Sequence, residues 1–593
     1  MQPSPQRSRL HHAMAGGMAV AVMVLVEAAL RWPAVLHGSD VRADPTLPQA
    51  TLLLGLPLGL VLGLVHRRVA LAALFLLALT LGDPVLASVG VVVIAAIAVE
   101  LAWRRPLVGA MPFFVLLGAC VLLRTPAAPR DNPVAPDIVV VVLDTVSARS
   151  TSLHGNVLPT TPNLQALAAE GTSYRHALAA APWTVPSHAA LFTGRLPQDL
   201  GCHHEHPQLD PGPPTTAELL GAAGYRTGAF IANPWVGDFN GLTRGFGHVE
   251  SGWERARAAR AFTLLSLVPS RPSKGGAGLV AASLDWLDES GDQPSMLFLN
   301  LLEAHSPFHQ AADADRFGVV DPLSVSERTH RVQHGGLSAV PDYPRPGELD
   351  AARTLYAGAV HASDALLATL RAGLEERGRW NDTVLVVTSD HGEAFGEHGF
   401  HGHMVGLYQE SLHVPLVLRV PGQGPAEVTG PVSLSRLHPT LLRIAGVADP
   451  DAGLPLPLSG PAEDLPVISE QLRPVQVLSD FEREGGASHL GELDARAVRV
   501  VQGTLALSLQ VPADGGPERW RLYDLAADPT ETHDLWPQRT ELDEATQVRV
   551  GELVAVAEGR AARFEASSAV AAGPQVEGDL RAQLEALGYL GGD

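Results

Sequence analysis

The longest hydrophobic pattern lies early in the chain, where residues 14–123 are almost continuously apolar. Short polar or basic points divide this region into stretches close to the roughly 20 residues that a helix needs to cross a bilayer. We therefore expect five membrane-spanning helices, at about 14–31, 48–65, 69–84, 86–103 and 107–123. Buried core helices are the alternative reading of such runs, and it is strongest for the short third stretch.

Arginines indicate how these predicted spans are oriented. They precede the first stretch, at Arg7 and Arg9, and they separate the second from the third and the fourth from the fifth, at 67–68 and 104–105. Basic residues near span ends resist translocation, so five crossings put all three groups on the cytoplasmic side. We expect a multi-pass protein of the cytoplasmic (inner) membrane, with the lipid bilayer as a partner and an extracytoplasmic catalytic domain.

After the apolar region the pattern changes to that of a globular α/β domain. Residues 124–136 contain four prolines and predict an extended linker. Strand-like apolar runs at 137–143, 295–301 and 383–388 then alternate with helical patterns at 162–171 and 353–378. This alternation predicts an α/β sandwich with a mostly parallel central sheet. The stretch 310–350 is polar and aperiodic, which indicates a lid or insertion near the site.

The expected division of the chain follows from these patterns. We expect an N-terminal membrane region at 1–123, a linker at 124–136, a catalytic domain at 137–463 and a smaller C-terminal α+β subdomain at 464–593.

Overall charge and cysteine content exclude two classes of protein. The formal net charge is −21, so nothing indicates the basic surface that a nucleic acid would need, and we expect no nucleic-acid partner. There are two cysteines, Cys120 and Cys202, which exclude a disulfide framework and a zinc site made of cysteine alone.

Polar residues follow the predicted strands and supply candidate metal ligands. Asp144, Asp390 and His391 stand at strand ends, where ligands of open α/β sheets bind. A mixed oxygen and nitrogen set suits zinc or manganese better than calcium or magnesium. Thr184, from the segment 181–194, is the fourth ligand in this prediction.

Thr184 is also the candidate nucleophile, because a divalent ion draws a hydroxyl toward its alkoxide and the alkoxide can attack an ester. A helix N-cap is the structural alternative for this threonine. His188 follows within about one turn and is predicted to bind a substrate oxygen or to carry a proton.

Further histidines are distributed over two segments. His305 follows a predicted strand and ranks above Glu303 as a site residue, whereas His403 is preferred over His398 and His401 for the leaving-group side. His305 and His403 are also the candidates for a second metal, which the sequence leaves open. The cluster at 202–206 lacks a preceding strand, and we expect it to be a solvated loop.

Several motifs give the soluble part a family resemblance. IVVVVLDT, APWTVPSHAALFTGRLP, LFLNLLEAHSPF, TSDHGEAFGEHG, YQESLHVPLVLRVPG and LYDLAADPTETHDL occur in this order. Together they resemble the sulfatase family of the alkaline phosphatase superfamily, which implies an alkaline-phosphatase-like α/β sandwich. The layout and the Asp, Thr, Asp, His set are also similar to lipoteichoic acid synthases and phosphoethanolamine transferases.

The motif around the nucleophile departs from the family pattern. Family sulfatases carry C-x-P-S-R or S-x-P-S-R, whose first residue matures to formylglycine, whereas this chain has Thr184 to His188. The resemblance, corrected for this difference, implies a divalent metal and no formylglycine. His403 stands where such enzymes have a lysine, and residues 232–235 stand for the family's G-K-W segment.

The combined prediction is a membrane-anchored, metal-dependent hydrolase of sulfate or phosphate esters. Its substrate is an anionic ester, with a lipid or an envelope glycan as candidates. Two alternatives remain: a phosphotransferase that moves a lipid headgroup to an envelope acceptor, and a catalytically inactive binding or regulatory homologue.

Overall fold

The computed structural model describes residues 135–252, 274–311, 314–335, 340, 342–475, 477–479 and 493–564. The five predicted membrane spans lie outside these residues. Within them, every helix is too short or too polar to cross a membrane. The division of the chain into four regions stays a prediction.

The central strand β1 (Asp137–Leu143) is apolar at every position after Asp137, and its place in the sheet explains this pattern. It pairs in parallel with β5 (Ser295–Leu301) and with β6 (Thr383–Thr388), and all its residues are buried. Successive side chains of a strand point to opposite faces. Val140 and Val142 pack into one core and Val139 and Val141 into another, so both faces of the sheet are covered.

The main sheet has the strand order β12-β11-β2-β10-β6-β1-β5-β3-β4, with β9 paired to β2. The remaining strands are β2 (Thr172–Leu178), β3 (Arg226–Ile231), β4 (His248–Ser251), β9 (His413–Val414), β10 (Leu416–Arg419), β11 (Ala426–Ser433) and β12 (Gly460–Pro461). Among the described strands of this sheet, antiparallel pairs are made only by β9 and β10. The expected mostly parallel α/β sheet is therefore confirmed.

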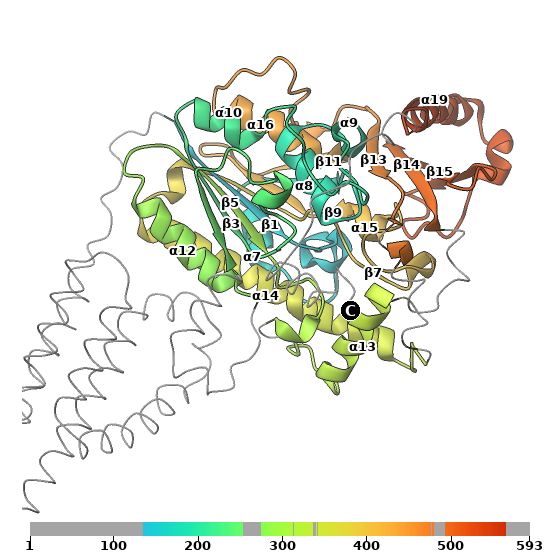
Figure 1. Cartoon of the computed structure of the whole chain (residues 1–593), viewed down its shortest axis with the longest axis horizontal. Coiled ribbons are helices and arrows are strands. Elements are labelled where there is room, and N and C mark those ends of the chain that lie inside the picture. Colours follow the sequence, from blue (N-terminus) through green and yellow to red (C-terminus); the bar gives the residue numbers. More distant parts are fainter. Residues whose placement is uncertain are drawn as a thin grey trace, which may run out of the picture. The chain divides into compact units, whose positions relative to one another are not determined.

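Helices cover both faces of this sheet (Figure 1). Apolar residues of α7 (Pro162–Ala168), α12 (Gly276–Asp288) and α14 (Glu348–Glu376) join the core on one face. Those of α8 (Thr184–Thr193), α10 (Thr216–Ala222) and α16 (Leu437–Ile444) join the core on the other. The long amphipathic helix predicted at 353–378 is thus present as α14.

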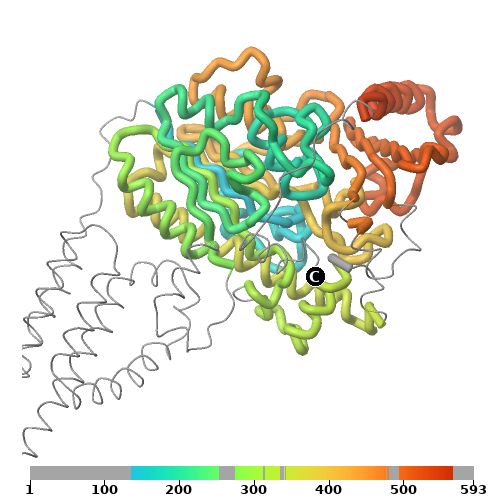
Figure 2. Tube along the Cα trace, viewed as in Figure 1, coloured from blue at the N-terminus to red at the C-terminus, as the bar shows by residue number. Residues whose placement is uncertain are grey.

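A second, four-stranded antiparallel sheet follows along the chain, shown in orange and red in Figure 2. It consists of β13 (Val467–Gln471), β14 (Ala495–Gln502), β15 (Leu505–Pro512) and β16 (Arg519–Asp524), and α19 (Glu544–Ala561) packs on it. Arg499 of β14 is fully buried, donates to the Leu407 carbonyl at 2.9 Å and pairs with Glu531. This buried ion pair connects the second sheet to the loops around the main sheet.

The stretch 310–350 is more regular than its sequence suggests. Residues Pro322–Gly335 form helix α13, and Val332 packs with Val340 and Tyr343 in a small apolar cluster. The prediction of an aperiodic segment is wrong there, because a few tertiary apolar contacts stabilise a helix whose own sequence is polar. A lid function for this segment stays a prediction.

Candidate active site

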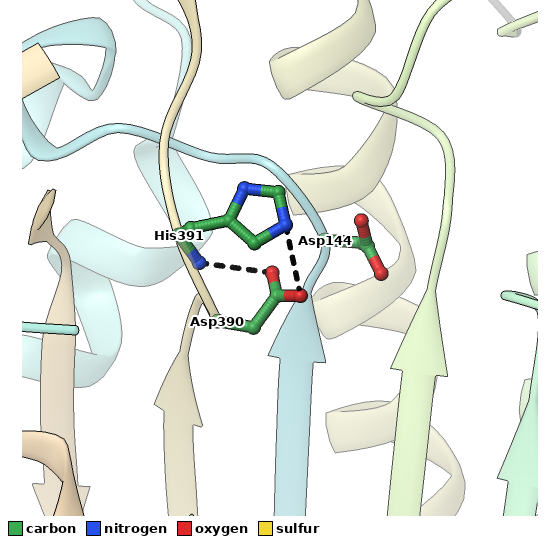
Figure 3. Close-up of side chains that lie close together, drawn as sticks. All are labelled: Asp144, Asp390 and His391. Atoms are coloured by element: carbon green, nitrogen blue, oxygen red, sulfur yellow. Dashed lines mark hydrogen bonds and ion pairs between the residues drawn. The ribbon is translucent and has the colours of Figure 1, made fainter. Parts of the chain in front are cut away.

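Three predicted metal ligands meet at the carboxyl ends of two neighbouring strands (Figure 3). Asp144 directly follows β1, and Asp390 and His391 follow β6. One ligand atom from each side chain lies within 4.8 Å of the other two, and all three residues are fully buried. Parallel pairing of β1 with β6 produces this convergence, since it brings both carboxyl ends to one edge.

Asp144 presents its two oxygens to different surroundings. Oδ2 accepts hydrogen bonds from the amides of Asn233 and Asn300, each at 2.9 Å, whereas buried Oδ1 has no hydrogen-bond partner among the described residues. Burial and the charge of Asp390 raise the pKa of Asp144 to about 7, against the opposing effects of His391 and the two amides. The charged form of this carboxylate is therefore disfavoured in the metal-free protein.

Asp390 has the same division between its two oxygens. Oδ1 accepts from the backbone N–H groups of Thr145, at 3.2 Å, and of His391, at 3.0 Å. Oδ2 has no hydrogen bond and lies 3.3 Å from His391 Nε2. Burial raises the pKa of Asp390 to about 7 although these backbone bonds favour the charged form.

The tautomer of His391 is set by a backbone contact. Its Nδ1 donates to the Gly392 carbonyl at 3.1 Å, which leaves Nε2 with a lone pair directed at Asp390 and Thr184. Burial lowers the pKa of His391 to about 4, so the ring is neutral near pH 7. Glycine is needed at 392 because a Cβ there would lie 2.0 Å from the Glu410 carbonyl oxygen.

Thr184 is the first residue of α8, and Trp183 is the N-cap residue of that helix. The N-cap alternative for Thr184 is therefore not observed. Its Oγ1 lies 3.4 Å from His391 Nε2 and accepts from Asn233 at 3.3 Å. Ser187, in the same helix, donates to the Asp390 carbonyl at 2.6 Å and so ties α8 to the loop after β6.

These four side chains fit a divalent metal ion. Asp144 Oδ1 and Asp390 Oδ2 are buried oxygens without hydrogen bonds, and His391 Nε2 has an available lone pair. Two buried carboxylates whose pKa values are both raised need a positive charge close by, which a cation supplies. The donor set of oxygen and imidazole is one that zinc and manganese accept.

His188 lies on the inner side of this group. Its Nδ1 donates to the Thr184 carbonyl at 2.9 Å and lies 3.5 Å from Asp390 Oδ2. Its ring is fully buried and makes edge contacts with Phe192 and Phe298. Burial lowers its pKa to about 4. The predicted contact of His188 with a substrate oxygen stays a prediction.

His403 and His305 extend the site beyond His391. The His403 ring stacks on His391 with 4.6 Å between centroids and lies 5.0 Å from the His305 ring. Its Nδ1 is 3.4 Å from the buried carboxyl of Glu393. The other two histidines of this segment face elsewhere: His398 stacks on Tyr408, and His401 contacts Tyr343.

The loop at 202–206 differs from its expected solvated state. Cys202 is fully buried, and His203, His204 and His206 are each less than 7% exposed. His204 stacks on Trp183 at 4.3 Å and donates from Nε2 to the Met404 carbonyl at 3.4 Å. The prediction of a solvated loop is wrong because aromatic and backbone partners from distant segments cover it.

A second group of possible ligands has another explanation. His398, Glu410 and Glu531 also have atoms within 4.8 Å of one another, but Arg499 already pairs with Glu531. We interpret this group as part of the ion-pair network that joins the second sheet to the main domain. Among described residues, His305 and His403 belong to neither metal-like group.

Four residues of this region were not predicted as site residues. Asn233 and Asn300 hold Asp144, Glu393 contacts His403, and Lys274 donates to the His305 carbonyl. Asn300 had a usable signal, since it is a polar residue within the apolar strand β5. Asn233 lies in residues 232–235, which stand for the family's G-K-W segment, although its bond to Asp144 was not predicted. Lys274 had no signal, because it acts across a distance in the sequence that no local pattern reports.

Comparison with known proteins assigns the class that this fold and this site define. The profile of the Sulfatase family matches residues 136–447, so the chain belongs to the Sulfatase family. Arylsulfatase K of Bos taurus is 25% identical over 435 residues, which cover 67% of this chain and 78% of that protein. An ulvan-active sulfatase of Formosa agariphila is 23% identical and covers 77% and 89%, respectively.

Solved structures show the same fold. The phosphonate monoester hydrolase of Agrobacterium radiobacter has a TM-score of 0.54 at 22% identity, covering 72% of this chain and 96% of that one. A 2-O GAG sulfatase has a TM-score of 0.52 at 19% identity, with 75% and 98% covered. The protein is thus an ester hydrolase of the sulfatase superfamily, and the inactive alternative is set aside.

The comparisons correct the cofactor prediction. Arylsulfatases normally use formylglycine together with a divalent metal, so the expectation that formylglycine plays no part is wrong by this comparison. The residue at that position is nevertheless Thr184, whose β-carbon carries a methyl group, and this side chain does not itself fit a group made from cysteine or serine.

The predicted location is corrected as well. The prediction of a multi-pass inner-membrane protein with an extracytoplasmic catalytic domain is contradicted by the similarity to arylsulfatases. The bilayer and nucleic-acid predictions are not tested by these relatives.

Proposed function

We propose that this chain hydrolyses a sulfate ester with a bound divalent metal and with Thr184 as the nucleophile. The observation that carries the proposal is the meeting of Thr184 with Asp144, Asp390 and His391, which includes two buried carboxylate oxygens without hydrogen bonds. These four residues would hold the ion, with zinc or manganese as the preferred metals.

The metal, when bound, would lower the pKa of a coordinated hydroxyl and stabilise negative charge on the ester oxygens. The residues of the chain then have separate tasks. Thr184 Oγ1 attacks the sulfur, forms a sulfate ester of threonine and displaces the substrate's alcohol. Its position at the N-terminus of α8 favours negative charge at this oxygen, because the helix dipole carries partial positive charge there.

The proton that leaves Thr184 Oγ1 passes to the departing alcohol through the histidines on the outer side. His403 stacks on His391 and has its Nδ1 near the carboxyl of Glu393, which fixes the orientation of the ring. His305 neighbours it. A water molecule then attacks the threonine ester, releases sulfate and returns a proton to Thr184. His188 contacts the Thr184 carbonyl and Asp390, and its proposed role is to position both residues.

The substrate class is proposed from the relatives. The names of two similar proteins refer to glycans. An ulvan-active sulfatase resembles this chain in sequence, and a 2-O GAG sulfatase resembles it in fold. We propose a sulfated glycan as substrate. A phosphate or phosphonate ester is the second candidate, because the Asp, Thr, Asp, His ligand set also suits phosphoryl transfer and a phosphonate monoester hydrolase shares the fold.

The test is a set of activity measurements on purified protein. After removal of metal with a chelator, manganese or zinc is restored, and aryl sulfate, phosphate monoester, phosphate diester and phosphonate substrates are compared. Thr184→Ala is expected to lose at least about 1,000-fold in kcat, as loss of a nucleophile does. Thr193→Ala, at the other end of the same buried helix, is the matched control. Full activity in Thr184→Ala would end the proposal.

The acceptor distinguishes hydrolysis from transfer. A phosphotransferase would yield a phosphorylated alcohol acceptor when a labelled lipid donor and a glycan acceptor are supplied together. Release of the anion to water with no modified acceptor supports the hydrolase.

A further inference from the structure

Lys274 is the only lysine in the 593-residue sequence. It precedes α12, and Gly275 lies between the lysine and the first residue of the helix. Gly275 has a left-handed backbone conformation, with φ of +88°. The proposed hydrolysis mechanism assigns no role to Lys274, and this residue belongs to none of the sequence motifs.

The backbone after Lys274 packs against the exit of β5. Gly276 donates from its N–H to Glu303 Oε1 at 3.0 Å. A Cβ at Gly276 would lie 2.4 Å from that same oxygen, so a side chain there would push the segment away. The sequence Lys-Gly-Gly therefore allows the chain to lie directly on the carboxyl end of β5.

This packing fixes the Lys274 side chain at the edge where the site lies. Its ammonium donates to the His305 carbonyl. The same edge carries Asp144, whose N–H donates to the Leu301 carbonyl of β5 at 2.9 Å. His305 continues this edge toward His403 and His391 through ring contacts. Lys274 is thus connected to the predicted metal ligand His391 through two neighbouring residues, His305 and His403.

Carboxyl groups surround the Lys274 ammonium, and their negative charges would repel an anionic substrate. Its ammonium interacts with the carboxyl groups of Glu303, Asp144 and Glu393, while desolvation lowers its pKa to about 7. Arg149 and Arg353 both pair instead with Glu397, which lies between β7 (Ala394–Phe395) and β8 (His401–Gly402), at 2.6 Å and 3.2 Å. An ester anion on the side of Glu303 and Glu393 would meet repulsion without a cation there.

We propose that Lys274 is an anion-binding residue of the active site, and that its ammonium holds charged oxygens of the ester beside His305 and His403. This assignment deepens the proposed function and rests on it. It gives the substrate a negatively charged ester group, as in a sulfate or phosphate half-ester, and it excludes neutral esters as good substrates.

The first test measures how strongly inorganic anions inhibit the metal-loaded enzyme. Lys274→Met should raise the inhibition constants of sulfate and phosphate roughly 10- to 100-fold, as loss of a hydrogen bond to a charged group does. Lys274→Arg keeps the charge and should restore most of the affinity. Arg226→Met removes a partly exposed charge at the start of β3, the opposite end of the sheet, and should change nothing. Unchanged inhibition constants in folded Lys274→Met would overturn the proposal.

The second test needs no turnover and therefore separates this proposal from the proposed function. Pyridoxal phosphate forms an imine with an amine, and borohydride reduces it to a stable adduct that peptide mass mapping detects. Lys274 and the N-terminal amine are the only targets in this sequence. Sulfate or phosphate should protect Lys274 and leave the N-terminus labelled. Equal labelling of Lys274 with and without saturating anion would overturn the assignment, even if the enzyme cleaves no tested ester.

Discussion

Asp144→Asn should change protein stability in opposite directions without and with metal. The pKa of Asp144 is raised from 3.8 to about 7 in the folded protein. At 1.36 kcal/mol per unit, the ionised side chain costs the metal-free fold about 4 kcal/mol at pH 8. The sign follows from linkage: a raised acid contributes stability below its unfolded pKa and loses it as pH rises through the folded value.

Asparagine at this position removes the charge, but burying its polar side chain still costs free energy. Its single oxygen can accept both amides that now bind Oδ2, while its NH₂ group replaces the unpartnered Oδ1. Leaving that donor unsatisfied costs about 1–3 kcal/mol. The metal-free variant should therefore be about 1–3 kcal/mol more stable than the metal-free wild type at pH 8.

The assay is unfolding in urea at pH 8, in chelator and again with excess manganese or zinc. The wild type should gain stability from the ion according to its affinity, whereas the variant should gain almost none. Asn300→Ala is the matched control, because it disturbs the same carboxylate and keeps its charge. A metal-free variant less stable than metal-free wild type would refute the reasoning that ionised Asp144 destabilises the metal-free fold.

Three further predictions concern the surroundings of the site. Because the pKa values of Asp144 and Asp390 are both raised to about 7, metal affinity should fall steeply as pH drops from about 7.5 to 5.5, which calorimetric titration at several pH values measures. Gly392→Ala should lower the metal occupancy of the folded protein, because its Cβ would lie 2.0 Å from the Glu410 carbonyl oxygen and the neighbouring His391 must move. Elemental analysis measures the occupancy, and full occupancy would contradict this prediction. Arg499→Met should cost about 3–5 kcal/mol in urea unfolding because it leaves Glu531 buried without its cation, and a loss under about 1 kcal/mol would show that the pair is not needed.

Local patterns predicted the frame of the molecule well. The run 138–143 is apolar at every position, which only a strand covered on both faces requires, and β1 is that strand. Asp144 and Asp390 could be picked out because they end such runs, and parallel strands bring their carboxyl ends to one edge. Thr184 was found through the motif around it, and the structure has it at the first turn of α8.

Other features could not be read from neighbouring residues. The helix α13 has a polar sequence and depends on the contacts of Val332. The loop at 202–206 is polar in sequence, yet His204 is buried because Trp183 stacks on it. In both cases the deciding partner lies far away along the chain, where hydropathy and spacing carry no information.

The sequence by itself determined which strands are buried, which side chains stand at their ends and that the chain carries the motifs of its family. Tertiary structure alone decided which oxygens of Asp144 and Asp390 remain without hydrogen bonds, which tautomer His391 adopts, and that the sole lysine lies at the exit of β5. The reason is physical: periodicity reports which face of an element is buried, whereas the charge state and partners of a buried polar group depend on residues from other elements packed against it.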